Sequence, residues 1–169
     1  MKKLTEEIIR SMSETFEGQP WFGESVMRKL ENLPYVIGYK TCIPESHNVA
    51  QIVGHLIAWK TFAAEKLKGN ESYNIDMDGP DNWPEIIVHS QDDWEELKRD
   101  LVAAQGKIYE QLNSKEDDSY LQEKVSGKDY NFDYLLKGIV QHDIYHIGQV
   151  GLIESQLKNQ EVDSGVFKT

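Results

Sequence analysis

Three histidines are spaced so that a helical fold would bring their imidazoles together. His142 and His146 lie four residues apart in the apolar segment 135–157, and His55 lies in a second apolar segment, residues 48–67. Four residues of α-helix rise about 6 Å and turn about 40° beyond one revolution, so the pair shares one helix face. Two imidazoles from one helix and a third from a facing helix can bind a divalent metal ion and leave a coordination position open.

The imidazole triad predicts the kind of ion and the chemistry it would support. Neutral imidazole is a common protein ligand of zinc and nickel, so we expect a divalent ion bound by His55, His142 and His146, with zinc as first choice and nickel second. An open position on such an ion would hold water and lower its pKa. The alternative is three core histidines satisfied by protein groups, and in that case no ion would bind.

Other polar residues near the triad are assigned lesser roles. Gln149 lies one turn beyond the histidine pair on the same side of the predicted helix, and we expect it to orient a ligand or a water molecule. Asp143 follows His142 and points about 100° away from it around the helix, which predicts a solvent-exposed carboxylate. We expect His47 and His89, which lie outside the apolar segments, to be solvated surface residues.

The elements that must position the triad are helices. Apolar side chains recur at three- and four-residue steps in four long segments and one short one. The long helices are predicted over residues 3–17, 48–67, 91–113 and 132–158, with a short extra helix near 23–33. This pattern predicts an all-α fold, a four-helix bundle, in a single domain over residues 1–169, with the polar tail after Lys158 outside the last helix. The polar connector 70–90 can span a helix length of about 30 Å, so the helices on either side of it can run parallel.

Two kinds of local signal refine this pattern. Asn48 followed by Gln51 three residues later is a capping box, and it predicts the start of the second long helix. Gly69 predicts the end of the same helix. Gly148 and Gly151 lie inside the last predicted helix, where glycine costs about 1 kcal/mol, and we expect them to permit close approach of a neighbouring element.

Composition excludes several classes of partner. The chain has 29 acidic and 18 basic residues and a formal charge of −11. This surface repels phosphate backbones and anionic lipids, so we expect no nucleic-acid and no membrane partner. Cys42 is the only cysteine, which rules out an intrachain disulfide and is typical of a cytoplasmic protein. No apolar stretch typical of a secretory signal or a membrane span is present, which favours the same location.

Three segments carry a family resemblance, and they occur in the order expected for that family. The segments are HNVAQIVGHLIAW at 47–59, HDIYHIGQ at 142–149 and the turn PWFGES at 20–25. Together they resemble the DinB/YfiT-like family. The resemblance implies a four-helix bundle with an up-down-down-up course. It also implies a metal triad of one histidine on the second long helix and two on the last, which maps onto His55, His142 and His146.

The resemblance also implies a function. Family members with an assigned activity are typically transferases or isomerases that depend on low-molecular-weight thiols, and many form dimers. It therefore implies a metal-dependent enzyme with a small-molecule substrate, a thiol whose thiolate the metal activates, and a homodimer. Two alternatives stay open, a non-catalytic metal-binding bundle (a stress-related binding module) and a hydrolase that uses metal-activated water. A fourth protein ligand, from His89 or Asp143, would favour the non-catalytic bundle.

Overall fold

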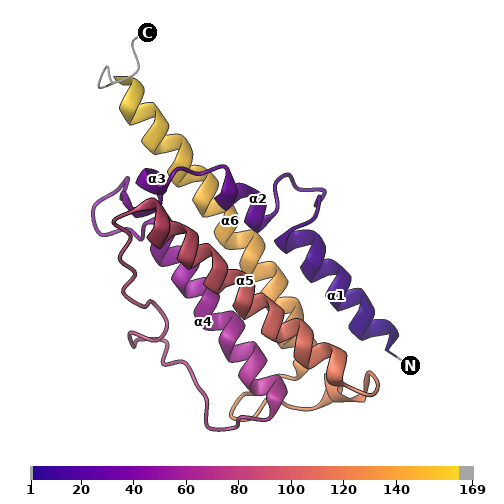
Figure 1. Cartoon of the computed structure of the whole chain (residues 1–169). Coiled ribbons are helices and arrows are strands. Elements are labelled where there is room, and N and C mark those ends of the chain that lie inside the picture. The colour runs from indigo at the N-terminus through magenta and orange to yellow at the C-terminus, as the bar shows by residue number, and fades with distance from the viewer. Residues whose placement is uncertain (1, 164–169) are drawn as a thin grey trace.

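Four long helices lie side by side in the computed structural model, which describes residues 2–163 (Figure 1). The long helices are α1 (Lys3–Phe16), α4 (Val49–Lys68), α5 (Gln91–Ser114) and α6 (Phe132–Asp163), and the short elements are α2 (Val26–Glu31), α3 (Tyr35–Tyr39) and the 3-10 turn η1 (Ser119–Gln122). The described residues form no β-strand, only an isolated bridge between Lys124 and Asn131. The predicted all-α fold is therefore confirmed.

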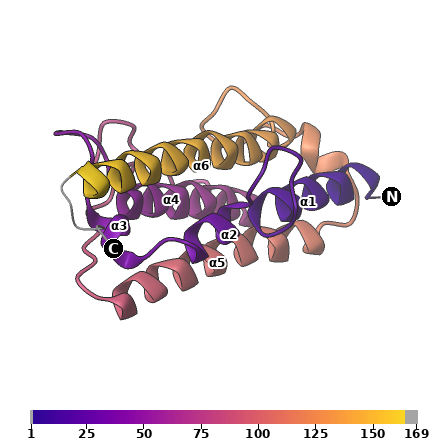
Figure 2. The same cartoon turned by 90° about the horizontal axis from the view of Figure 1, so that it is seen from above.

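The direction of the helices follows from the long connector between α4 and α5. Figures 1 and 2 show α1 and α6 running in one direction and α4 and α5 in the other. The connector returns along the outside of the bundle from the end of α4 to the level at which α4 began. The adjacent helices α4 and α5 consequently run parallel and pack against each other.

Both ends of α4 are closed by the residues that the sequence indicates. The Asn48 side chain accepts a hydrogen bond from the Gln51 amide at 2.9 Å, and the Gln51 side chain accepts one from the Asn48 amide at 2.9 Å. Gly69 ends the helix in the left-handed conformation with φ of +91°, which glycine adopts without a Cβ penalty. The rigid helix between these caps carries His55.

The structure differs from the predictions in one additional helix and in the end of the last helix. The five-residue helix α3 follows Pro34 and was not predicted, because so short a segment shows no helical periodicity. The prediction that the polar tail lies outside the last helix was wrong for its first residues. Helix α6 has 32 residues in all and continues past Lys158 to Asp163. No proline or glycine interrupts residues 159–163, and the final residues, 164–169, lie outside the described range. Across the described residues, none of the helices has both the length and the apolar character required to cross a bilayer.

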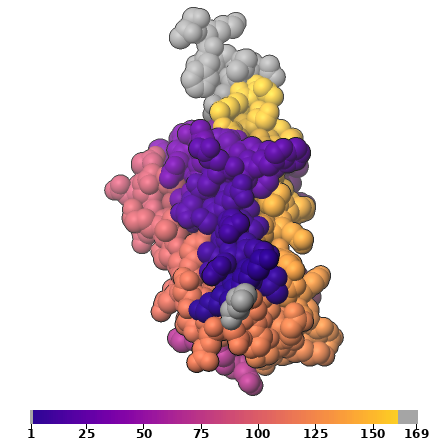
Figure 3. Space-filling view, turned by 90° about the vertical axis from the view of Figure 1, so that its right-hand side faces the viewer, coloured from indigo at the N-terminus to yellow at the C-terminus, as the bar shows by residue number. Residues whose placement is uncertain are grey.

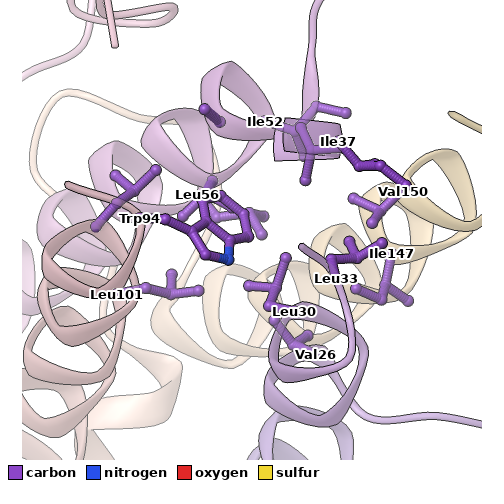
Figure 4. Packing of buried hydrophobic residues seen from close by; sticks show 14 of the residues in the cluster. Val26, Leu30, Leu33, Ile37, Ile52, Leu56, Trp94, Leu101, Ile147 and Val150 are labelled. Atoms are coloured by element: carbon purple, nitrogen blue, oxygen red, sulfur yellow. The ribbon is translucent and has the colours of Figure 1, made fainter. Parts of the chain in front are cut away.

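The core is built around side chains from every long helix. Trp94 of α5 is fully buried, and Figure 4 shows it between Leu56 of α4 and Leu30 of α2. The N-terminal segment lies between α5 and α6 on the face shown in Figure 3, and it covers that side of the bundle.

A side chain of the α4–α5 connector approaches the α4 backbone closely at Gly54. A Cβ atom on Gly54 would lie 2.5 Å from Cγ1 of Ile86, so the connector packs directly on α4 at this point. The expectation for α6 was wrong. A Cβ on Gly148 would meet no atom within 4 Å, and one on Gly151 would meet only the Lys29 side chain, at 3.7 Å. Gly148 therefore faces open space, and Gly151 meets only a flexible side chain of α2, so neither glycine permits a close approach of helix backbones.

Candidate metal centre

The three predicted histidines come together between α4 and α6. Nε2 of His142 lies 3.0 Å from Nε2 of His55 and 3.0 Å from Nε2 of His146. The nitrogen atoms that the three rings offer all lie within 4.8 Å of one another. Two nitrogen atoms bound to one zinc ion at 2.0–2.1 Å can be at most about 4.1 Å apart, so both 3.0 Å separations suit a shared ion. A shared ion would draw the His55 and His146 nitrogen atoms, which lie within 4.8 Å of each other, to within that limit.

Hydrogen bonds outside the triad hold two of the three rings in one orientation. Nδ1 of His55 lies 2.5 Å from the main-chain oxygen of Asn82, which can only accept, so this nitrogen carries the proton and donates it. Nδ1 of His146 donates to Oε1 of Gln149 at 2.6 Å. The protonated Nδ1 atoms leave both Nε2 atoms with a free lone pair directed at His142. Acceptors of this kind are typical of metal-binding histidines.

The charge state of the triad also suits a cation. Burial lowers the pKa of His55 and His146, and burial together with the neighbouring imidazoles lowers the pKa of His142 to about 3. All three rings are therefore neutral at neutral pH. The Nε2 of His142 carries at most one proton, which must serve two acceptors at 3.0 Å. A divalent ion would satisfy all three nitrogen atoms at once, so these residues could hold a metal ion.

Asn82 in the α4–α5 connector is a site residue that sequence reasoning missed. Asn82 is 5% exposed, and its main-chain oxygen is the acceptor for His55. Its Oδ1 accepts a hydrogen bond from Nε1 of Trp59 at 3.0 Å. Its Nδ2 donates to the main-chain oxygen of Met77 at 2.9 Å. The contact with His55 is made by a backbone carbonyl, which every residue type possesses, so residue identity offered no signal for it.

An aromatic stack covers one face of His55. The Trp83 ring lies 3.9 Å from the His55 ring at an interplanar angle of 9°, and His47 stacks on the far face of Trp83 at 3.6 Å and 5°. His47 is exposed, as predicted, but its ring is part of the wall of the site rather than surrounded by solvent. The stack restricts the movement of His55 and limits the access of water to it.

Asp143 contradicts the prediction of a solvent-exposed carboxylate. It is 3% exposed, and its Oδ2 accepts from Nζ of Lys60 at 2.6 Å. Nζ of Lys60 also donates to Oε1 of Gln105 at 2.8 Å. The prediction failed because α4 packs against α6 and brings Lys60 to Asp143. Burial raises the pKa of Asp143, and the ammonium group of Lys60 opposes that rise.

His89 does not reach the triad. It is exposed, and its amide donates to the Asp93 carboxylate at the start of α5. The carboxylate of Asp143 is bound to Lys60, and Asp143 does not belong to the group of residues that could hold an ion. The triad of the described structure is therefore not completed by either of the two candidate fourth ligands.

The triad opens onto two cavities that share His55, Met77 and His142. The larger has a volume of about 610 Å³ and extends along α6 toward its C-terminal end, past Gln149 and Leu152. The smaller has a volume of about 300 Å³ and lies toward the N-terminal end of α6. A group bound to an ion in the triad would therefore have space on two sides.

The fold and the site define an all-helical bundle with a three-histidine centre that could hold a metal ion beside two cavities. The family model of the DinB superfamily matches residues 6–150, a range that contains all three histidines and Gln149. The chain belongs to the DinB superfamily. Searches of curated proteins and of solved structures gave no match.

Proposed function

We propose that this protein is a metal-dependent enzyme that uses a low-molecular-weight thiol to transfer or isomerise a small molecule. The observation that carries the proposal is the convergence of three imidazole Nε2 atoms where two cavities meet. Structural zinc sites are closed by four protein ligands, whereas catalytic sites keep a position open. Asp143 is bound to Lys60 and His89 is exposed, which supports an open position and argues against a purely structural ion.

The residues of the site divide the work between binding and orientation. His55, His142 and His146 would hold the ion, zinc or nickel, while Asn82 and Gln149 keep two of the rings in the binding tautomer. The bound ion would act as a Lewis acid and lower the pKa of a thiol placed at its open position. The stack on His55 would keep water from that side of the site.

The reaction that we propose needs a thiol and an electrophilic carbon compound. The thiol sulfur forms a bond to the electrophilic carbon, the leaving group departs with the bonding electrons, and the thiol proton passes to solvent. In an isomerisation the thiol would add and then depart with its own bonding pair. The larger cavity has the volume for a polar thiol, and Ser46, Gln149 and Gln156 line it with hydrogen-bonding groups.

Location and assembly are part of the same proposal. We place the enzyme in the cytoplasm, where low-molecular-weight thiols stay reduced. We also propose a homodimer, since Trp21 is 99% exposed and Leu152 of α6 is 59% exposed, and such side chains are common in interfaces. Sedimentation velocity of the full chain would give the mass of the assembly, and a single monomeric species would refute the dimer.

The metal assignment is tested by metal analysis of protein purified without a polyhistidine tag. We expect about one zinc or nickel ion per chain in the wild type and in the His89→Ala control, and a loss of most of it in His146→Ala. Equal metal content in the wild type and His146→Ala would refute the ligand assignment.

The activity is tested with metal-loaded protein. Glutathione, cysteine and coenzyme A would each be supplied with 1-chloro-2,4-dinitrobenzene, and thioether formation would be followed by absorbance. We expect at least one thiol to react faster with the wild type and His89→Ala than with His146→Ala. Failure of every thiol, with turnover of simple esters instead, would refute the transferase and favour the hydrolase. Bound metal with neither activity would favour the non-catalytic bundle.

A further inference from the structure

The smaller of the two cavities beside the triad has a composition that specifies a kind of ligand. We name it the aromatic cavity, and its volume is about 300 Å³. Apart from the residues shared with the larger cavity, its wall consists of Trp59, Tyr130, Tyr134, Leu135, Gly138 and Ile139. None of its lining residues is a carboxylate, a lysine or an arginine.

Two kinds of contact orient the aromatic rings of the cavity wall. Nε1 of Trp59 donates to Oδ1 of Asn82, the same residue whose main-chain oxygen orients His55. The rings of Tyr130 and Tyr134, which also line the cavity, lie 5.3 Å apart at 38°. A preformed wall of flat rings is suited to flat apolar ligands, because little side-chain entropy is lost on binding.

The volume of the aromatic cavity and the charges around it further limit the kind of ligand that it can bind. An apolar cavity of about 150 Å³ is known to bind benzene, so a cavity of about twice that volume accepts one or two rings. The formal charge of −11 on the chain disfavours anions, and the wall of the aromatic cavity away from the triad holds no cation to compensate an anionic group. The group bound against that wall should therefore be uncharged.

We propose that the aromatic cavity binds the apolar ring system of an uncharged electrophilic substrate, with its reactive carbon directed at the triad. The Trp59 ring lies 6.1 Å from the His142 ring, so a group stacked on Trp59 reaches the neighbourhood of the triad. The thiol would approach from the larger cavity on the other side. The assignment to a substrate rests on the proposed function, but the binding of an uncharged aromatic compound can be tested without it.

Gly138 offers a way to fill the cavity without disturbing its wall. A Cβ at this position would meet no atom within 4 Å, so the side chain of Gly138→Leu would extend into open space. Gly148→Leu is the matched control, since it lies on the same helix, also meets no atom within 4 Å and lines neither cavity. Both variants gain the same helix propensity, so a difference between them reports on the cavity.

Binding would be measured by calorimetry on metal-free protein with 2-naphthalenemethanol, an uncharged two-ring compound, and with 2-naphthoate as its anionic counterpart. We expect the alcohol to bind about tenfold or more tightly than the anion, because no cation offsets the desolvation of a carboxylate. Gly138→Leu should weaken binding of the alcohol about tenfold or more, because its side chain occupies the ligand's space. Gly148→Leu should leave the Kd unchanged. Equal binding by the two leucine variants, or equal binding of the two compounds, would overturn the proposal.

A second pair of variants guards against a folding defect in Gly138→Leu. Tyr134 is 67% exposed at the edge of the aromatic cavity, and Tyr145, 64% exposed on the same helix, lines only the larger one. Tyr134→Ala should weaken binding of the alcohol about three- to tenfold and Tyr145→Ala should not, and equal effects would overturn the proposal. His146→Ala should retain binding while losing metal. Failure of the aromatic cavity is therefore distinguishable from failure of the metal site.

Discussion

Removal of one member of the buried Lys60–Asp143 ion pair should destabilise the bundle severely. Lys60 is 1% exposed and Asp143 is 3% exposed, and their charged atoms lie 2.6 Å apart. Lys60→Met leaves the carboxylate without its cation in a site that water does not reach. Loss of one partner of such a pair costs about 3–5 kcal/mol. This cost is a large part of the free energy of unfolding of a typical domain, which is about 5–15 kcal/mol.

The double variant Lys60→Met/Asp143→Leu should recover much of that loss. It removes both charges and fills the space with apolar groups, a replacement that is often close to neutral. Gln105 then loses the donor to its Oε1, and an unsatisfied buried amide costs about 1–3 kcal/mol. The two single variants together should cost about 6–10 kcal/mol and the double variant about 1–3 kcal/mol, a coupling of at least about 3 kcal/mol.

Urea unfolding followed by circular dichroism at 222 nm would give the four free energies of this cycle, with equal m-values required for the comparison. Lys137→Met is the control, since the Lys137–Asp133 pair lies on the same helix with Lys137 61% exposed. It should cost less than about 0.5 kcal/mol. The reasoning is refuted if Lys60→Met costs less than about 1 kcal/mol, or if the cost of the double variant equals the sum of the single costs.

Three further predictions concern the connector, Gln149 and acid. Gly54→Ala should displace Ile86 and with it the connector, so it should lower both the metal affinity and the urea midpoint. Gly106→Ala lies in open space on α5 and should stabilise the protein by about 1 kcal/mol. Equal urea midpoints of the two variants would contradict this prediction. Gln149→Leu removes the acceptor from His146 and should weaken zinc binding about 10–100-fold in a competition titration, and an unchanged affinity would show that the hydrogen bond has no such role. The pKa of His142 is lowered to about 3 from 6.5, so the unfolded chain takes up the proton first, and metal-free protein should lose stability as pH falls below 6.5 toward 3. Urea midpoints at several pH values should fall less steeply in His142→Gln, and parallel curves would disprove the assignment.

Features that depend on neighbouring residues were determined by the sequence. Apolar periodicity located the four long helices, because burial of one helix face repeats every three or four residues. The capping box of Asn48 and Gln51 formed as predicted, since both partners lie within one helical turn. The common face of His142 and His146 follows from the same local geometry, whatever surrounds the helix.

Features that depend on distant residues were decided by the tertiary structure alone. Asp143 is buried because Lys60, 83 residues away, faces it across the bundle, and the spacing within α6 contains no information on that contact. Asn82 orients His55 through a carbonyl that any residue would provide. The two cavities exist only where the connector, α4 and α6 leave space between their side chains. The periodicity of apolar residues shows which side of a helix is buried. Which residues of other elements contact that side depends on how the helices and the connector pack in the tertiary structure.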